Sequence, residues 1–278
     1  QGCSMIHFTT LGGGGGGGGQ GTFASNIRGG AGGSSSTLNH ALVPAPFLPD
    51  ILQITVGAGG AGAGAGGGGT AGGASSVASW INNLGSLGQA QIILQSSGGQ
   101  GGSATGIGAS VGSRIGTINY ARMINIFDYN VVNGALETII YTNGGRGGDA
   151  NGNTAGQDIV FGGNNCTNIT GGAGGGSNGN TANPQLGGNI TNIPSLYGNT
   201  SITAGDTAGA NGQNGYTLWR PTFISFGGSG GNANTGGRGG KGGDGGYGAG
   251  GGGSGAGTNT LFLTGGKGGD GFVIISCW

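Results

Sequence analysis

Charged residues are scarce in this chain. Of its 278 residues, eight are Lys or Arg and eight are Asp or Glu, so the formal net charge at pH 7 is zero. Proteins that bind nucleic acid need a basic surface to neutralise phosphates, and this composition offers none, so we expect no nucleic-acid partner. Disordered linkers usually combine polarity with high net charge, so the low charge also argues against a disordered chain.

Proline, histidine and long apolar runs are scarce as well. Six prolines exclude collagen, which needs glycine at every third position together with abundant proline. His7 and His40 are isolated from each other in the sequence, so we expect no histidine-based metal site. No run of about twenty apolar residues occurs, so we expect no membrane span.

Glycine is abundant instead, with 81 residues. In the stretch 227–257 a side chain appears about once every three residues, as in Arg238, Lys241, Asp244 and Tyr247. A period of three is that of a polyproline-II helix, which makes no internal hydrogen bonds and cannot stay ordered alone. Several such helices can pack side by side, because glycine lets backbones approach closely enough to bond to one another. We therefore predict a bundle of polyglycine helices, to which the tracts 12–19, 57–73, 98–102, 144–148, 171–176 and 265–271 also contribute.

One charged hexapeptide recurs within these tracts. Gly-Gly-Lys/Arg-Gly-Gly-Asp occurs at 144–149, 239–244 and 265–270, with the basic and acidic residues one helical turn apart. One interpretation is that these pairs only mark solvated outer edges, where an ion pair is worth about 0–1 kcal/mol. The other is that they set the register between neighbouring helices.

Short apolar segments flank the glycine tracts. Residues 5–11 lead into the first tract and residues 272–276 follow the last one, and their β-branched and aromatic content predicts two strands that pair with each other. Cys3 and Cys277 flank this predicted pair, so a disulfide can join the chain ends; free thiols are the alternative. Further strand candidates lie before other tracts, at 51–56, 91–95, 137–142, 158–161 and 222–226.

These segments predict one all-β or irregular domain, 1–278. Polyglycine helices would form a bundle or sandwich with short strands at its base, long aromatic-containing loops and almost no α-helix. Only residues 75–87 are expected to hold a helical turn or two.

The segments between tracts are poorer in glycine and carry most of the aromatic residues. Long irregular connections are usually functional, and aromatic rings suit the C–H faces of sugars. The alternative is that each ring only covers the bundle. The candidate receptor-binding residues are Trp80, Tyr120, Tyr129, Tyr197, Tyr216 and Trp219.

Two segments match catalytic or cofactor-binding motifs, but each lacks another residue that such a site requires. Residues 57–62 fit the dinucleotide fingerprint, but no acidic residue follows until Asp128, well beyond the distance expected for a ribose ligand. Ser229 lies in a Gly-x-Ser-x-Gly sequence, but both histidines precede it, whereas a hydrolase of this type needs a later histidine. We therefore expect no enzymatic activity, no cofactor and no metal.

Three segments carry a resemblance to a known group of proteins. They are Ile-Thr-Val-Gly-Ala-Gly-Gly-Ala at 54–61, the eight glycines after the opening strand, and the closing segment 265–278 ending in Val-Ile-Ile-Ser-Cys-Trp. The chain resembles the glycine-rich domains of bacteriophage tail fibres and the tail-fibre tip adhesins of T-even-like phages. That resemblance implies parallel polyglycine helices in a sandwich and loops that bind a bacterial receptor.

The resemblance also implies a location and partners. We expect a virion-surface or extracellular protein that contacts a host cell-surface glycan or outer-membrane protein and other virion or fibre proteins, and that can form homo-oligomers. The alternative function is a self-assembling filament or coat subunit that binds no receptor, in which an exposed terminal strand joins a neighbouring sheet.

Overall fold

The computed structural model of the chain contains strands, two 3₁₀ turns and extended glycine tracts. No α-helix occurs among the residues that the structure describes, which confirms the expected all-β or irregular class. The described residues are 2–23, 26–48, 50–80, 90–104, 137–139, 154–161, 168–177, 185–198, 201–220, 222–258 and 264–278.

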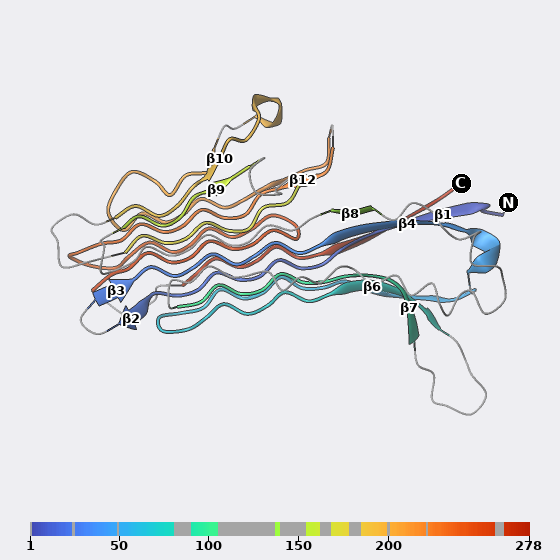
Figure 1. Cartoon of the computed structure of the whole chain (residues 1–278), viewed down its shortest axis with the longest axis horizontal. Coiled ribbons are helices and arrows are strands. Elements are labelled where there is room, and N and C mark those ends of the chain that lie inside the picture. The colour runs from blue at the N-terminus through green and yellow to red at the C-terminus, as the bar shows by residue number, and fades with distance from the viewer. Residues whose placement is uncertain are drawn as a thin grey trace.

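Two small sheets lie at one end of an elongated molecule, where both chain termini also lie (Figure 1). The first has the order β13-β1-β4-β8, and β1 pairs antiparallel with both β13 and β4. The second has the order β5-β6-β7 and is antiparallel throughout. The strand bounds are Met5–Leu11 (β1), Leu38–Pro44 (β4), Leu52–Thr55 (β5), Ser75–Trp80 (β6), Ala90–Ser96 (β7), Glu137–Ile139 (β8) and Phe272–Cys277 (β13).

The remaining elements are short. Three strand pairs contain β2 with β3, β9 with β10 (parallel), and β11 with β12. Two 3₁₀ turns, η1 and η2, complete the set. Their bounds are Gly21–Phe23 (β2), Asn26–Arg28 (β3), Ala45–Phe47 (η1), Ile159–Val160 (β9), Ile190–Thr191 (β10), Ser195–Tyr197 (η2), Thr217–Leu218 (β11) and Ile224–Ser225 (β12).

Long glycine tracts run side by side along the molecule and continue the strands of the two sheets (Figure 1). Hydrogen bonds of the tract 12–20 reveal their packing. Its successive N–H groups donate in rotation to three segments, 31–37, 67–73 and 266–269, so every third residue meets the same neighbour. Its carbonyl groups accept in the same rotation from 60–66, 99–102 and 251–254. A chain that bonds in this way with a period of three is a polyglycine helix surrounded by others, as predicted.

Close packing explains why these positions are glycine. A methyl group added at Gly17 would collide with the carbonyl oxygen of Gly252 in the neighbouring tract. The clashing atom belongs to a backbone that is itself hydrogen-bonded on other sides, so it cannot move aside without breaking the packing. The period of three is therefore set by backbone contacts instead of an apolar face.

At the outer edge of the bundle, side chains bind backbone groups of the next helix. Asn211, Asn214 and Thr217, three residues apart, accept hydrogen bonds from the N–H groups of the residues thirty positions later, 241, 244 and 247. The carboxylates of Asp244 and Asp270 accept the N–H groups of Lys267 and Gly59, each at 2.8 Å. These contacts favour the register interpretation of the charged hexapeptide; its copy at 144–149 lies outside the described residues.

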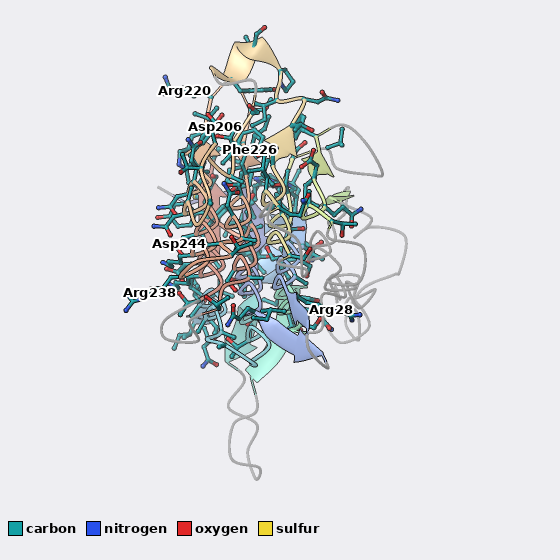
Figure 2. All side chains as sticks on the ribbon, turned by 90° about the vertical axis from the view of Figure 1, so that its left-hand side faces the viewer. Arg28, Asp206, Arg220, Phe226, Arg238 and Asp244 are labelled. Carbon is teal, nitrogen blue, oxygen red and sulfur yellow. A yellow bond between two sulfur atoms is a disulfide. The ribbon has the colours of Figure 1, made fainter. Side chains whose placement is uncertain are left out.

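Three apolar cores pack against the glycine bundle, and the smallest lies where β1 ends and β4 begins. The first of the two larger cores lies between the two sheets and includes Phe8, Val77 and Leu94, all fully buried. The second surrounds Phe226, which Figure 2 shows inside the molecule while Arg238 projects outward. The cores therefore fill the places where tracts give way to strands.

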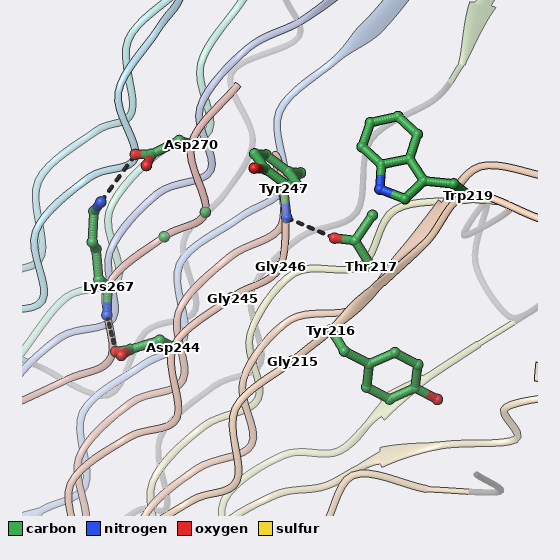
Figure 3. Close-up of a pocket in the computed structure, with 12 residues that line it drawn as sticks. Gly215, Tyr216, Thr217, Trp219, Asp244, Gly245, Gly246, Tyr247, Lys267 and Asp270 are labelled. Atoms are coloured by element: carbon green, nitrogen blue, oxygen red, sulfur yellow. Dashed lines mark hydrogen bonds and ion pairs between the residues drawn. The ribbon is translucent and has the colours of Figure 1, made fainter. Parts of the chain in front are cut away.

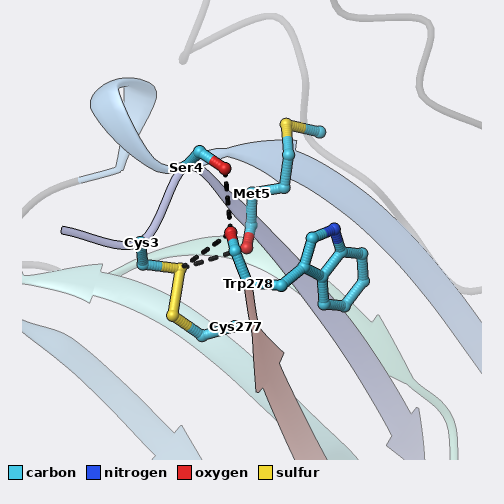
Figure 4. Close-up of a disulfide and its surroundings, with 5 residues drawn as sticks. All are labelled: Cys3, Ser4, Met5, Cys277 and Trp278. Carbon is cyan, nitrogen blue, oxygen red and sulfur yellow. Dashed lines mark hydrogen bonds between the residues drawn. A yellow bond between two sulfur atoms is a disulfide. The ribbon is translucent and has the colours of Figure 1, made fainter. Parts of the chain in front are cut away.

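The strand end closes the chain on itself. Cys3 and Cys277 form a disulfide that links residues 274 positions apart, with their Cα atoms 5.7 Å apart (Figure 4). The carbonyl oxygen of Trp278 accepts hydrogen bonds from the hydroxyl of Ser4 at 2.9 Å and from the N–H group of Met5 at 3.1 Å. β1 and β13 pair from Ile6 to Leu11, as the terminal segments predicted.

One local expectation differs from the structure. Residues 75–80, where a helical turn was expected, form the strand β6 at the centre of its sheet. Val77 lies opposite Ile54 on β5 and opposite Leu94 on β7 and is fully buried. Burial of this side chain between two partner strands outweighs the weak helical preference of a short Ser- and Ala-containing segment. Residues 81–87 lie outside the described residues.

Candidate functional site

The six aromatic candidates do not form one group. Tyr120 and Tyr129 lie outside the described residues, as does the side chain of Trp80 at the end of β6. Tyr197 and Tyr216 are partly buried and pack against the core around Phe226. The Tyr216 ring lies 4.9 Å from the Phe226 ring, and Tyr216 also lines the groove beside Trp219 that is described below.

Trp219 differs from the other described candidates because half of its surface is exposed to solvent. It follows β11, and its ring contacts one aromatic ring four residues later and two from more distant parts of the chain. Ring centroids lie 5.1 Å away for Phe223, 5.2 Å for Phe272 and 6.0 Å for Tyr247. We call these four residues the aromatic cluster. Aromatic contacts at such distances are favourable, so the cluster holds the exposed indole in place.

Sequence reasoning missed Phe223, Tyr247 and Phe272 as members of this cluster. The sequence places Tyr247 in a glycine helix and the two phenylalanines in strand candidates, whereas the predicted binding residues come from the glycine-poor segments. The available signal was the position of Tyr247, a large aromatic residue inside a tract of Gly and small polar residues. A bulky ring there has no space inside the bundle and must lie on its surface, where 45% of Tyr247 is exposed.

A groove of about 420 Å³ runs beside Trp219 and Tyr247 (Figure 3). Thr217 and Tyr247 belong to adjacent segments, and the Thr217 hydroxyl accepts the N–H group of Tyr247 at 2.9 Å. Glycines 215, 245, 246, 268 and 269 line the groove without side chains to fill it. The groove therefore has aromatic residues on one part of its wall and glycine backbone on another.

Three charged side chains complete the lining: Asp244, Lys267 and Asp270. Oδ1 of Asp270 accepts hydrogen bonds from the Gly59 N–H at 2.8 Å and from the Lys267 ammonium at 2.9 Å. These two donors, the backbone one first, hold the pKa of Asp270 below its ordinary value. Oδ1 of Asp244 accepts the Lys267 N–H at 2.8 Å and lies 3.4 Å from the ammonium of Lys241. Both carboxylates are thus oriented by the neighbouring helices.

A second cluster of polar rings lies on the sheet β13-β1-β4-β8. The rings of His7 and His40 are stacked with centroids 5.4 Å apart, and Nδ1 of His40 lies 2.9 Å from the Thr9 hydroxyl. The described part of the chain contains no group of three His, Cys, Asp or Glu residues that could hold a metal ion. Nor does it contain a helix long and apolar enough to cross a membrane.

The chain was compared with models of protein families and with curated protein sequences, and neither comparison found a match.

Proposed function

We propose that this chain is a non-enzymatic structural protein of a virion surface or appendage, where it binds a receptor on the host cell. The observation that carries the proposal is the solvent-open groove beside Trp219 and Tyr247, built on the side of a hydrogen-bonded scaffold. Support also comes from the resemblance of the glycine tracts and the closing segment to bacteriophage tail-fibre domains.

The scaffold has properties that suit an exposed appendage. In the tract 12–20 successive backbone N–H groups bind three different neighbours, so the network extends in two directions across the bundle. A protease needs an extended, accessible chain, and pulling one interior tract out of this network would break bonds to several others at once. The disulfide between Cys3 and Cys277 ties the two ends together and suits an oxidising, extracellular environment.

Binding of the purified chain to a panel of intact bacterial strains tests the proposal. We expect saturable binding to some strains, reduced by Trp219→Ala or Tyr247→Ala. The matched control is Trp278→Ala, which removes a tryptophan that is 61% exposed and lies at the strand end, outside the groove. Absence of saturable binding to every strain would count against a receptor-binding role.

A filament or coat subunit is the second candidate, and the edge strand β13 favours it. β13 is the outermost strand of its sheet, contains no charged residue, and leaves Ile274 and Ile275 about two-fifths exposed. Unprotected edges of this kind can pair with another chain. Light scattering would then show association that grows with concentration and disappears in Ile274→Lys, because a lysine on an edge strand opposes pairing. A chain that stays monomeric at every concentration would exclude this candidate.

A further inference from the structure

We propose that the groove beside Trp219 and Tyr247 binds a neutral glycan, with a sugar ring against the aromatic residues and its hydroxyl groups on Asp244 and Asp270. This inference rests on the proposed receptor-binding function and names the class of receptor that the groove fits. Four observations carry it: the support of the aromatic rings, the free oxygens of the carboxylates, the charge balance and the size of the groove.

The aromatic wall of the groove is held in place before any ligand binds. Trp219 lies against Phe223 and Phe272, whose rings also contact each other with centroids 5.1 Å apart. Tyr247 contacts both Trp219 and Phe272. An exposed ring that is fixed by other rings loses little conformational entropy when a ligand stacks on it. Tryptophan and tyrosine both offer broad apolar faces that suit the C–H surface of a sugar.

The carboxylates provide acceptors of fixed orientation. Each of them uses Oδ1 for its protein contacts, Asp270 with Gly59 and Lys267, and Asp244 with Lys267 and Lys241. None of the described residues donates a hydrogen bond to Oδ2 of either residue. An ionised carboxylate has about four acceptor positions, so each can still receive the hydroxyl protons of a sugar.

The charges of the groove lining favour neutral glycans over anionic ones. The groove lining contains two carboxylates and one ammonium group, that of Lys267, which is already paired with Asp270. A sialylated or phosphorylated glycan would place a further negative charge beside Asp244 and Asp270, and the described lining residues offer no free cation to receive it. The lining therefore favours a neutral glycan.

The size and openness of the groove agree with this ligand. Its volume of about 420 Å³ lies in the lower part of the roughly 300–1,000 Å³ range of small-ligand sites. The five lining glycines add no side chain that would block the backbone polar groups beside the sugar.

A glycan array probed with the full-length chain, followed by calorimetry with the neutral oligosaccharide bound best, tests the inference. We expect neutral glycans to be selected over sialylated and phosphorylated ones. Trp219→Ala and Tyr247→Ala should each weaken binding by about tenfold or more, as truncation of a central aromatic contact does. Trp278→Ala should leave the affinity unchanged, and Trp219→Phe, which keeps a ring against Phe223 and Phe272, should cause a smaller loss than Trp219→Ala.

A charge variant tests the polar half of the groove. Asp244→Asn keeps the Oδ1 acceptor for the Lys267 N–H group but removes one negative charge, so it should increase binding of anionic glycans relative to neutral ones. No change in this ratio would contradict the role given to Asp244.

The remaining outcomes separate the two proposals. A chain that binds bacterial cells but no neutral glycan, or whose glycan binding survives both aromatic substitutions, would overturn the glycan inference and leave receptor binding in place. A chain that binds neither cells nor glycans would overturn both.

Discussion

Each interior glycine of the bundle occupies a position where a methyl group has no room. Gly17 and Gly64 show the contrast most clearly. A Cβ added at Gly17 would collide with the Gly252 carbonyl, whereas a Cβ added at Gly64 would meet no atom within 4 Å. Gly17→Ala should therefore lower the free energy of unfolding by about 1–3 kcal/mol or more, the usual cost of overpacking. Gly64→Ala should be neutral or slightly stabilising, because it reduces the freedom of the unfolded chain. Urea unfolding of both variants provides the measurement, and equal midpoints would contradict the packing argument.

The contribution of Asp270 to the stability of the protein depends on pH. Its pKa is lowered in the folded protein, chiefly by the hydrogen bond from the Gly59 N–H and then by Lys267. A carboxyl group with a lowered folded pKa stabilises the protein fully above its unfolded pKa of about 3.9 and loses this contribution as the pH falls toward the folded value. The stability difference between the native chain and Asp270→Asn should therefore shrink as the pH falls from about 5 to below the unfolded pKa. A difference that stays constant over this range would show that the carboxylate charge does not contribute.

At the scale of the element, the outer helices are joined by side chains that repeat every three residues. Asn214 accepts the N–H group of Asp244 at 2.8 Å, between the matching contacts of Asn211 and Thr217. Asn214→Ala should destabilise the protein by about 0.5–1.5 kcal/mol, the net value of one such hydrogen bond. Asn214→Asp, which keeps the acceptor, is the control. Hydrogen exchange should show faster exchange of the Asp244 N–H group in the alanine variant alone, and unchanged protection there would contradict this role.

The glycine tracts and the terminal strands could be predicted from the sequence, but the neighbours of each tract could not. The period of three and the apolar ends of the chain are visible in the order of residues, and they correctly indicated polyglycine helices and the pairing of β1 with β13. Glycine has no side chain to distinguish one neighbour from another. The choice of neighbour depends instead on contacts such as Asp270 with Gly59, 211 residues apart. The groove escaped prediction for the same reason, because Trp219, Tyr247 and Phe272 meet only after the tracts have packed.

At the scale of the whole molecule, the disulfide closes almost the entire chain into one loop. Cys3 and Cys277 are separated by 274 residues, and a cross-link over a long loop restricts the unfolded chain strongly, with a stabilisation on the order of 4 kcal/mol. Replacing both cysteines with alanine should therefore lower the urea midpoint of unfolding. Adding a reductant should shift the native chain to the same midpoint and leave the double variant unchanged.

The sheet topology predicts which part of the protein is destabilised first when the disulfide is reduced. Among the residues that the structure describes, β13 lies at the edge of its sheet and pairs only with β1, so it is the strand that the disulfide secures directly. Hydrogen exchange in the reduced protein should accelerate first at residues 272–277, before the interior tract 12–20, whose N–H groups are bonded to three neighbours. Uniform acceleration through the tract and the strand would instead mean that the glycine bundle and the strand end unfold as one cooperative unit.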